Sequence, residues 1–487
     1  MSTLRRAIGN GGVMMAAQGI TWTSTLLLTA ALGRRLGDAG FGDLYLAMSF
    51  GVIFSVLVQF GLDQQLVRAV ARDRSLAGAY LANSLAIKGV LGLLAYGLIV
   101  GLAQALHYPS DVRRTIAVYA VILLFNGVST SLTAVYQAAE FLFPAAMGDV
   151  LEKVFDAVVG VLVLTHGAGI STIAGVFVVG AAVNAAWKTA FLRRMPAMTL
   201  TIDRAVVRGL LLGALPFFLY WALGSVYYRV DAILLSKMTD AAVVGWYGAA
   251  YKLFDTLVFL PNIVSSAILY PILSRLSVSS HDDLRRALSK GLSVILIIGI
   301  PICTGMFVLA APIIHLVYGQ PEFVHAVPAL RWLAVALLIL YVNSILAAAV
   351  FSLNQERKMT VVAALATVVN FGLNWLLIPH FQHVAAAAVT AGTELFILGY
   401  LLSVMPRDLL SAGTAVVFAK SLGAATSMAA VLYVLRGQSI FLLVPAGGAV
   451  YVVVGLLLRV VPAEDVRVLR RALALRPAQP SPGSETA

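Results

Sequence analysis

Long apolar segments make up nearly the whole chain and are interrupted at short intervals by charged residues and Pro/Gly clusters. A helix that spans the hydrocarbon core of a membrane needs about 20 mostly apolar residues. This pattern predicts fourteen spans, at residues 11–32, 42–66, 80–105, 115–137, 145–165, 170–192, 208–235, 243–270, 291–318, 327–351, 359–378, 383–405, 413–435 and 438–459. We therefore expect an all-α integral membrane protein with about 14 transmembrane helices.

Composition supports a membrane protein over a soluble one. Charged residues are 11% of the chain and hydrophobic residues 60%, whereas a soluble domain carries about 25% charged residues. The net charge of +12 would suggest nucleic acid in a soluble protein, but Lys and Arg accumulate on the cytoplasmic side of membrane proteins. We expect no nucleic-acid partner. The single cysteine, Cys303, lies in an apolar segment and allows no intramolecular disulfide.

The distribution of positive charge predicts the orientation. Most Lys and Arg residues fall in alternate loops, on the side that also holds both chain ends. The positive-inside rule then predicts cytoplasmic N- and C-termini and an even number of spans. Between the eighth and ninth spans, "SRLSVSSHDDLRRALSKG" predicts an amphipathic helix at the cytoplasmic interface.

Two turns in the chain echo each other. "LGRRLGDAGFGDLY" follows the first span and "LSKMTDAAVVGWY" follows the seventh. With a one-residue gap, three pairs correspond: Asp38 with Asp240, Gly42 with Gly245, and Tyr45 approximately with Tyr247. The echo fits a duplication of six spans, which would give parallel repeats. We expect four parts: an N-lobe at 1–200, a C-lobe at 201–408, two further helices at 409–462, and a basic, then disordered cytoplasmic tail at 463–487.

Three stretches carry a family resemblance. They are "LGRRLGDAGFGDLYLAMSF", "YRVDAILLSKMTDAAVVGWYGAAYKLFDTLVFLPNIVSSAILYPILSRL" and "VVNFGLNWLLIPHFQHVAAAAVTAGTE". In that order along the chain, they resemble Wzx-type flippases of lipid-linked oligosaccharides, in the multidrug/oligosaccharidyl-lipid/polysaccharide exporter superfamily. The last stretch departs from the family pattern, because Gln382 and Ala385 stand where glycine is usual.

The resemblance implies two six-helix lobes around a central cavity, working by alternating access. It implies that the substrate is an undecaprenyl-pyrophosphate-linked oligosaccharide, flipped across the bacterial inner membrane for surface polysaccharide biosynthesis. Membrane lipid and a polysaccharide polymerase or assembly machinery are the implied partners. A transporter of this kind is not an enzyme, and no Walker A sequence, HExxH motif or Cys/His cluster occurs, so we expect neither a cofactor nor a metal.

Charged residues inside the predicted spans are the candidate site, because charge in the membrane interior is costly and usually functional. A pyrophosphate calls for cations, and we assign substrate contact to four residues: Arg229, Lys252, Arg34 and Arg35. We assign ion coupling or cavity charge to Asp231, Asp255 and Glu394.

Spacing refines these assignments. Arg229 lies ~9 Å from the outer end of its span, and Lys252 is predicted at a similar depth in the next span. Asp255 is one turn from Lys252 and shares its face. Glu394 has no obvious local partner, whereas the charges at Glu152, Lys153 and Asp156 are expected near the cytoplasmic entry.

Three alternatives stay open at this point. A multidrug/cation antiporter of the same superfamily would place acidic residues at the cavity centre. A lipid II flippase would share the fold, and the sequence discriminates it poorly. A membrane-embedded polysaccharide polymerase or ligase usually has a large extracytoplasmic loop, and no loop here is long enough.

Overall fold

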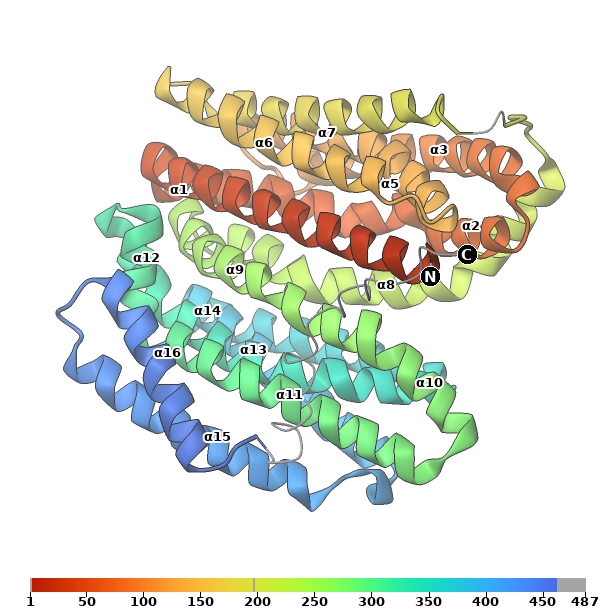
Figure 1. The fold of residues 1–487 in the computed structure, drawn as a ribbon. Coiled ribbons are helices and arrows are strands. Elements are labelled where there is room, and N and C mark those ends of the chain that lie inside the picture. Colours follow the sequence, from red (N-terminus) through yellow and green to blue (C-terminus); the bar gives the residue numbers. More distant parts are fainter. Residues whose placement is uncertain (1, 196–197, 462–487) are drawn as a thin grey trace, which may run out of the picture.

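The computed structural model describes residues 2–195 and 198–461, and within them it contains helices and turns but no β-strand (Figure 1). This confirms the all-α membrane architecture. The predicted tail at 463–487 lies outside the described residues. The helices of the first half are α1 (Ser2–Gln59), α2 (Leu62–Arg72), α3 (Ala77–Ala105), α4 (Ser110–Ala120), α5 (Ile122–Ala138), α6 (Phe143–Thr165) and α7 (Ile170–Leu192).

The second half continues with longer and more interrupted helices. They are α8 (Arg204–Met238), α9 (Ala241–Asn262), α10 (Tyr270–Ser279), α11 (His281–Val308), α12 (Ala310–Tyr318), α13 (Ala326–Ser352), α14 (Glu356–Val404), α15 (Ala412–Val434) and α16 (Ile440–Leu457). A seven-residue π-helical segment, Ile263–Leu269, joins α9 to α10.

Ten helical segments of the described residues are long and apolar enough to cross a membrane. Two of them hold two predicted spans each, because α1 bends at Gly37 and α14 bends at Gln382. The predicted fifth and seventh spans coincide with α6 and α8, which are not among the ten. The total of fourteen transmembrane helices stays a prediction.

Gln382, which stands where the family pattern usually has glycine, lies at the bend of α14. Gln382 has a φ of 51°, which is a left-handed conformation that favours glycine. The chain therefore keeps the tight turn and accepts a glutamine there. At the corresponding bend of α1 the residue is a glycine, Gly37, which adopts its φ of 69° without strain.

The predicted interfacial helix between the eighth and ninth spans is wrong as a separate element. The chain turns at Ser280, whose hydroxyl accepts from the Asp283 N–H and begins α11. The charged residues of this segment are Arg275, in the middle of α10, and a group in the first turns of α11. The predicted ninth span is also interrupted, at Leu309 between α11 and α12.

The helices form two bundles that meet along α1, α8 and α9 (Figure 1). Helix α8 joins both, because Gln65 of α2 donates to the Gly213 carbonyl in its first half at 2.7 Å. In its second half, Tyr227 donates to Glu394 of α14 at 2.8 Å. This arrangement agrees with two lobes, although the residue boundaries of the predicted lobes stay a prediction.

The two echoing turns meet in space. A Cβ on Gly42 would collide with the Ala241 carbonyl oxygen, and a Cβ on Gly245 would collide with the Asp38 carbonyl oxygen. The backbones of α1 and α9 therefore approach closely at both glycines, in a reciprocal way. The rings of Tyr45 and Tyr247, the third pair of the echo, lie edge to face 6.3 Å apart.

Candidate functional site

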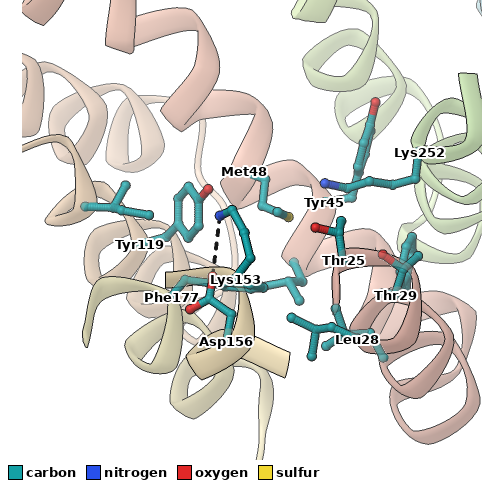
Figure 2. Close-up of a pocket in the computed structure, with 14 residues that line it drawn as sticks. Thr25, Leu28, Thr29, Tyr45, Met48, Tyr119, Lys153, Asp156, Phe177 and Lys252 are labelled. Carbon is teal, nitrogen blue, oxygen red and sulfur yellow. Dashed lines mark hydrogen bonds and ion pairs between the residues drawn. The ribbon is translucent and has the colours of Figure 1, made fainter. Parts of the chain in front are cut away.

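A cavity of about 230 Å³ lies beside α1, at the junction of the two bundles. Helices α1, α4, α5, α6 and α7 supply most of its wall, and α9 closes it with Lys252. Two lysines, one carboxylate and two tyrosines give it most of its polar character: Lys153, Lys252, Asp156, Tyr45 and Tyr119 (Figure 2). Two threonines of α1 complete the polar lining. Both halves of the chain thus contribute a cation to one cavity.

Lys252 is the unpaired cation of this cavity. Its side chain extends from α9 into the cavity, where Tyr45 and Thr25 of α1 also lie (Figure 2). Within the described part of the chain, the Lys252 side chain forms no hydrogen bond or ion pair. An ammonium that is partly buried and unpaired is well placed to receive an anion.

Lys153 faces the same cavity from the middle of α6, with its carboxylate partners on the same helix. Its ammonium lies 2.6 Å from Glu152 Oε1 and 3.5 Å from Asp156 Oδ2. The Lys153 side chain keeps 39% exposure, whereas that of Asp156 keeps 2%. We expected these three charges near the cytoplasmic entry, which stays a prediction; Lys153 and Asp156 line the cavity.

A polar network continues from this cluster to the surface between α6 and α7. The Asn184 amide donates to Glu152 Oε2 at 2.6 Å and to Asp149 Oδ1 at 3.2 Å. Lys188, which is 2% exposed, donates to the same Asp149 oxygen at 2.9 Å. Asp149 is 56% exposed, so the network runs from the surface of the protein to the wall of the cavity.

Arg229 lies next to the cavity but is engaged on all sides. It donates to Asp255 Oδ2 at 2.5 Å and to the Tyr45 hydroxyl at 2.8 Å. Its guanidinium also lies over the Tyr251 ring, 4.7 Å from the centroid. Arg229 thus links α8, α9 and α1, and it does not line the cavity. Of the two residues expected at a similar depth, Lys252 lines the cavity and Arg229 does not; the depth itself stays a prediction.

Asp255 pairs with Arg229 rather than with Lys252, the neighbour that sequence spacing suggested. Asp231, two residues from Arg229, has other hydrogen-bond partners than that pair. It is 1% exposed and accepts hydrogen bonds from the Tyr247 hydroxyl and from the Ala232 N–H. Asp231 therefore ties α8 to α9 inside the second bundle.

Glu394 has partners that the sequence did not reveal. Its carboxylate accepts from the Tyr227 hydroxyl and from the Asn343 amide, each at 2.8 Å. These partners come from α8 and α13, and Glu394 is 3% exposed. It does not line the cavity.

The two arginines at the bend of α1 lie away from the cavity lining. Arg34 donates to the carbonyls of Leu316 at 2.7 Å and Val317 at 3.3 Å, so it satisfies the free carbonyls at the end of α12. Arg35 is exposed, and it forms no hydrogen bond or ion pair with the described residues. Substrate contact by Arg34 and Arg35 stays a prediction.

Sequence reasoning missed the tyrosines and underrated α6. Tyr45, Tyr119 and Tyr251 carry no charge, so a search for charged residues passed over them. The spacing of Asp149, Glu152 and Asp156 was the available signal, because residues three and four apart share one helix face.

The fold and the cavity define a multi-pass membrane protein with two helical bundles and, between them, a mostly apolar cavity that receives one lysine from each half of the chain. A family profile described as "Polysaccharide biosynthesis protein" matches residues 8–277, more than half of the chain. The chain therefore belongs to this family of polysaccharide biosynthesis proteins. A second profile, described as MatE, matches residues 216–376, in keeping with the exporter superfamily.

Two curated relatives match in part. "Probable flippase AglR" of Haloferax volcanii is 27% identical over 165 residues, which are 34% of this chain and 35% of the relative. "Probable lipid II flippase MurJ" of Haemophilus influenzae is 26% identical over 219 residues, 42% of each chain. The match thus spans less than half the length of either relative.

Solved structures show the same fold over most of the chain. A lipid II flippase MurJ in an inward closed conformation superposes with a TM-score of 0.72 at 13% identity, covering 96% of this chain and all of that one. A multidrug resistance MATE transporter in an inward-facing conformation gives a TM-score of 0.56 at 15% identity, covering 81% and 96%. These low identities show the fold alone.

Proposed function

We propose that the protein flips an undecaprenyl-pyrophosphate-linked oligosaccharide across the bacterial inner membrane for surface polysaccharide biosynthesis. The observation that carries the proposal is the pair of lysines, Lys153 and Lys252, that the two halves of the chain present to one cavity. Cations from both lobes suit a polar head group that carries a pyrophosphate. Family membership and the names of the two flippase relatives support the same class of activity.

The size of the cavity supports an alternating-access mechanism. Pockets for drug-sized ligands usually measure about 300–1,000 Å³, and this cavity measures about 230 Å³. A sugar head group of several rings needs more room, so the two lobes have to move apart to admit it. In the proposal both chain ends lie in the cytoplasm, and the head group enters from that side.

Of the residues first assigned to substrate contact, Lys252 suits the role better than Arg229. Arg229 is already neutralised by Asp255 and held by Tyr45, whereas Lys252 has no such partner among the described residues. A lysine binds phosphate as a point charge. We therefore assign the first contact with the pyrophosphate to Lys252 and a second contact to Lys153.

The test uses the full chain in phospholipid vesicles loaded with an undecaprenyl-pyrophosphate-linked oligosaccharide. A membrane-impermeant lectin reports how much sugar reaches the outer leaflet. Lys252→Met should slow this appearance about tenfold, the effect of losing roughly 1.4 kcal/mol of anion binding. The matched control is Lys420→Met, because Lys420 lies on α15 and bonds only weakly, at 3.4 Å, to the Arg459 carbonyl. Equal rates for both variants and the unchanged protein would overturn the assignment.

A lipid II flippase is the second candidate, favoured by the similarity of the fold to that of a MurJ structure. The same vesicles loaded with lipid II distinguish the two. Faster movement of lipid II than of the oligosaccharide lipid would make lipid II the substrate. Uptake of a fluorescent organic cation, with neither lipid moved, would instead favour a drug antiporter.

A further inference from the structure

The polar cluster of α6 and α7 carries more negative than positive charge. Three carboxylates, Asp149, Glu152 and Asp156, lie on one face of α6, and two ammonium groups, Lys153 and Lys188, lie among them. If all five groups are ionised, one negative charge is uncompensated. Because Asp149 is half exposed and Asp156 is 2% exposed, the cost of that excess falls on the Asp156 end of the cluster.

Asp156 is the least satisfied member of the cluster. Its Oδ2 lies 3.5 Å from the Lys153 ammonium, and its Oδ1 has no hydrogen-bond partner among the described residues. A Cβ on Gly180 of α7 would collide with this Oδ1, so the carboxylate is packed tightly against α7. A buried carboxylate oxygen without a donor is unfavourable unless it receives a proton or a cation.

The other groups around Asp156 do not relieve this deficit. On α7 the next polar groups, Asn184 and Lys188, are engaged with Glu152 and Asp149. Tyr119 of α4 and the threonines and Tyr45 of α1 are neutral cavity groups. The remaining cation is Lys252 of α9, which belongs to the opposite bundle (Figure 2). Lys153 is thus the one ion-pair partner of Asp156 among the described residues.

Glu152 and Asp156 would respond differently if Lys153 moved. Glu152 would keep the hydrogen bond from Asn184, 2.6 Å from its Oε2. Asp156 would keep no hydrogen bond within the described residues. Loss of Lys153 therefore leaves Glu152 stabilised as an anion and Asp156 as an isolated buried charge.

We propose that binding of an anionic head group in the cavity is linked to uptake of one proton by Asp156. The inference rests on the proposed function, because it takes the ligand to be a phosphate-bearing lipid. Lys153 neutralises either the carboxylates of α6 or the phosphate, but not both. When a phosphate lies between Lys153 and Lys252, Lys153 turns away and Asp156 Oδ1 takes a proton from a hydronium ion or a buffer acid. One O–H bond forms at Asp156, one bond to hydrogen breaks in the donor, which is left as water or as the buffer's conjugate base, and no bond of the ligand breaks.

A proton fits this place better than a metal ion. Sodium and calcium need several oxygen ligands, whereas a proton needs the single oxygen that Asp156 leaves free. Asp156 lines the cavity, so the proton reaches it from the cavity side and needs no link to the Glu152–Asn184–Asp149 network. Proton uptake partly offsets the negative charge of the bound head group. This lowers the cost of moving the head group across the membrane inside the protein.

The experiment measures proton uptake directly. Farnesyl pyrophosphate, a soluble polyprenyl pyrophosphate, is titrated calorimetrically into the full chain in nanodiscs at pH 7. Two buffers of different ionisation enthalpy separate the heat of binding from the heat of protonation. The expected result is uptake of about one proton per bound probe, with the same value when choline replaces sodium.

Asp156→Asn should bind the probe at least as tightly and take up about zero protons. The matched control is Asp149→Asn, whose carboxylate lies on the same face of α6 but is 56% exposed; it should keep the uptake. Lys153→Gln gives a second check. Without the lysine, Asp156 already holds its proton, so binding of the probe should cause no further proton uptake.

The outcomes separate the two proposals. If the unchanged protein binds the probe without proton uptake, or if Asp156→Asn takes up as much as the unchanged protein, the linkage is wrong and the proposed function stands. If the proton uptake disappears when choline replaces sodium, the ion linked to binding is sodium and the proton linkage is wrong. If the probe does not bind, or binds Lys252→Met equally well, the phosphate site and the linkage both fail.

Discussion

Two charged clusters border the cavity, and they divide exposure in opposite ways. In the α8/α9 cluster the cation is the more buried member, with Arg229 13% exposed and Asp255 32% exposed. In the α6 cluster the carboxylate is buried, with Lys153 39% exposed and Asp156 2% exposed. A buried cation is fixed in its place, whereas an exposed one is available to a ligand.

The origin of the partners explains this difference. Arg229 is held from three sides, by Tyr45 of α1 and by Asp255 and Tyr251 of α9. Lys153 has its carboxylate partners on its own helix, one and three residues away. Movement of Arg229 would break contacts between helices, while movement of Lys153 changes only the rotamer of one side chain. These contacts suit the first cluster to a structural role and the second to the proton exchange proposed above.

The largest effect on stability is expected at the first cluster. Arg229→Ala should lower the free energy of unfolding by roughly 2 kcal/mol, between the values typical of exposed and of fully buried ion pairs. The reason is that Asp255 loses its partner and Tyr45 loses the bond between the bundles. Equilibrium unfolding in mixed SDS micelles measures it.

A double variant sharpens this expectation. Arg229→Ala combined with Asp255→Asn removes the stranded carboxylate, so it should be more stable than Arg229→Ala alone. If the double variant is less stable by the full sum of two independent losses, the two side chains do not act as a pair.

A smaller effect is expected from crowding the second cluster. Gly180→Ala should lower the free energy of unfolding by about 1 kcal/mol, the low end for overpacking, because the new Cβ meets Asp156 Oδ1. The oxygen is the far end of a side chain, so the carboxylate turns aside instead of breaking the helix contact.

The matched control lies on the same helix, at Gly175. A Cβ there would meet only Val118 at 4.0 Å. Gly175→Ala should leave stability unchanged or raise it by up to about 1 kcal/mol, because alanine favours the helix. Equal losses at Gly175 and Gly180 would mean that Asp156 is not the cause.

The smallest effect on stability is expected at the unpaired lysine. Lys252→Met should change the free energy of unfolding by less than about 0.5 kcal/mol, as for a substitution that breaks no polar contact. This contrasts with the tenfold loss of flipping proposed for the same variant. A loss of stability as large as that of Arg229→Ala would show that Lys252 has a structural partner.

Part of this site was predictable from spacing along single helices. The sequence pointed to Lys252, which lines the cavity, and put Arg229 and Asp231 on different helix faces, where they have different partners, because both inferences use only the rise and the turn of a helix. It did not find the partners of Glu394, which come from α8 and α13. It also put Asp255 on the same helix face as Lys252, while the structure pairs Asp255 with Arg229. Contacts between helices depend on the rotation of each helix about its axis. That rotation is set by packing and cannot be read from spacing along one helix.

The sequence by itself determined the helical membrane architecture, since backbone polar groups in hydrocarbon have to be satisfied within each segment. It also revealed the two echoing turns whose glycines pack against each other. The tertiary structure alone decided which charges meet across the bundles. It put Lys153 and Asp156 in the cavity wall, held Arg229 beside it, and left Lys252 unpaired among the described residues. The physical reason is that a charge in a low-dielectric interior takes its character from neighbours within a few ångströms, and the packing of α1, α6 and α9 supplies those neighbours.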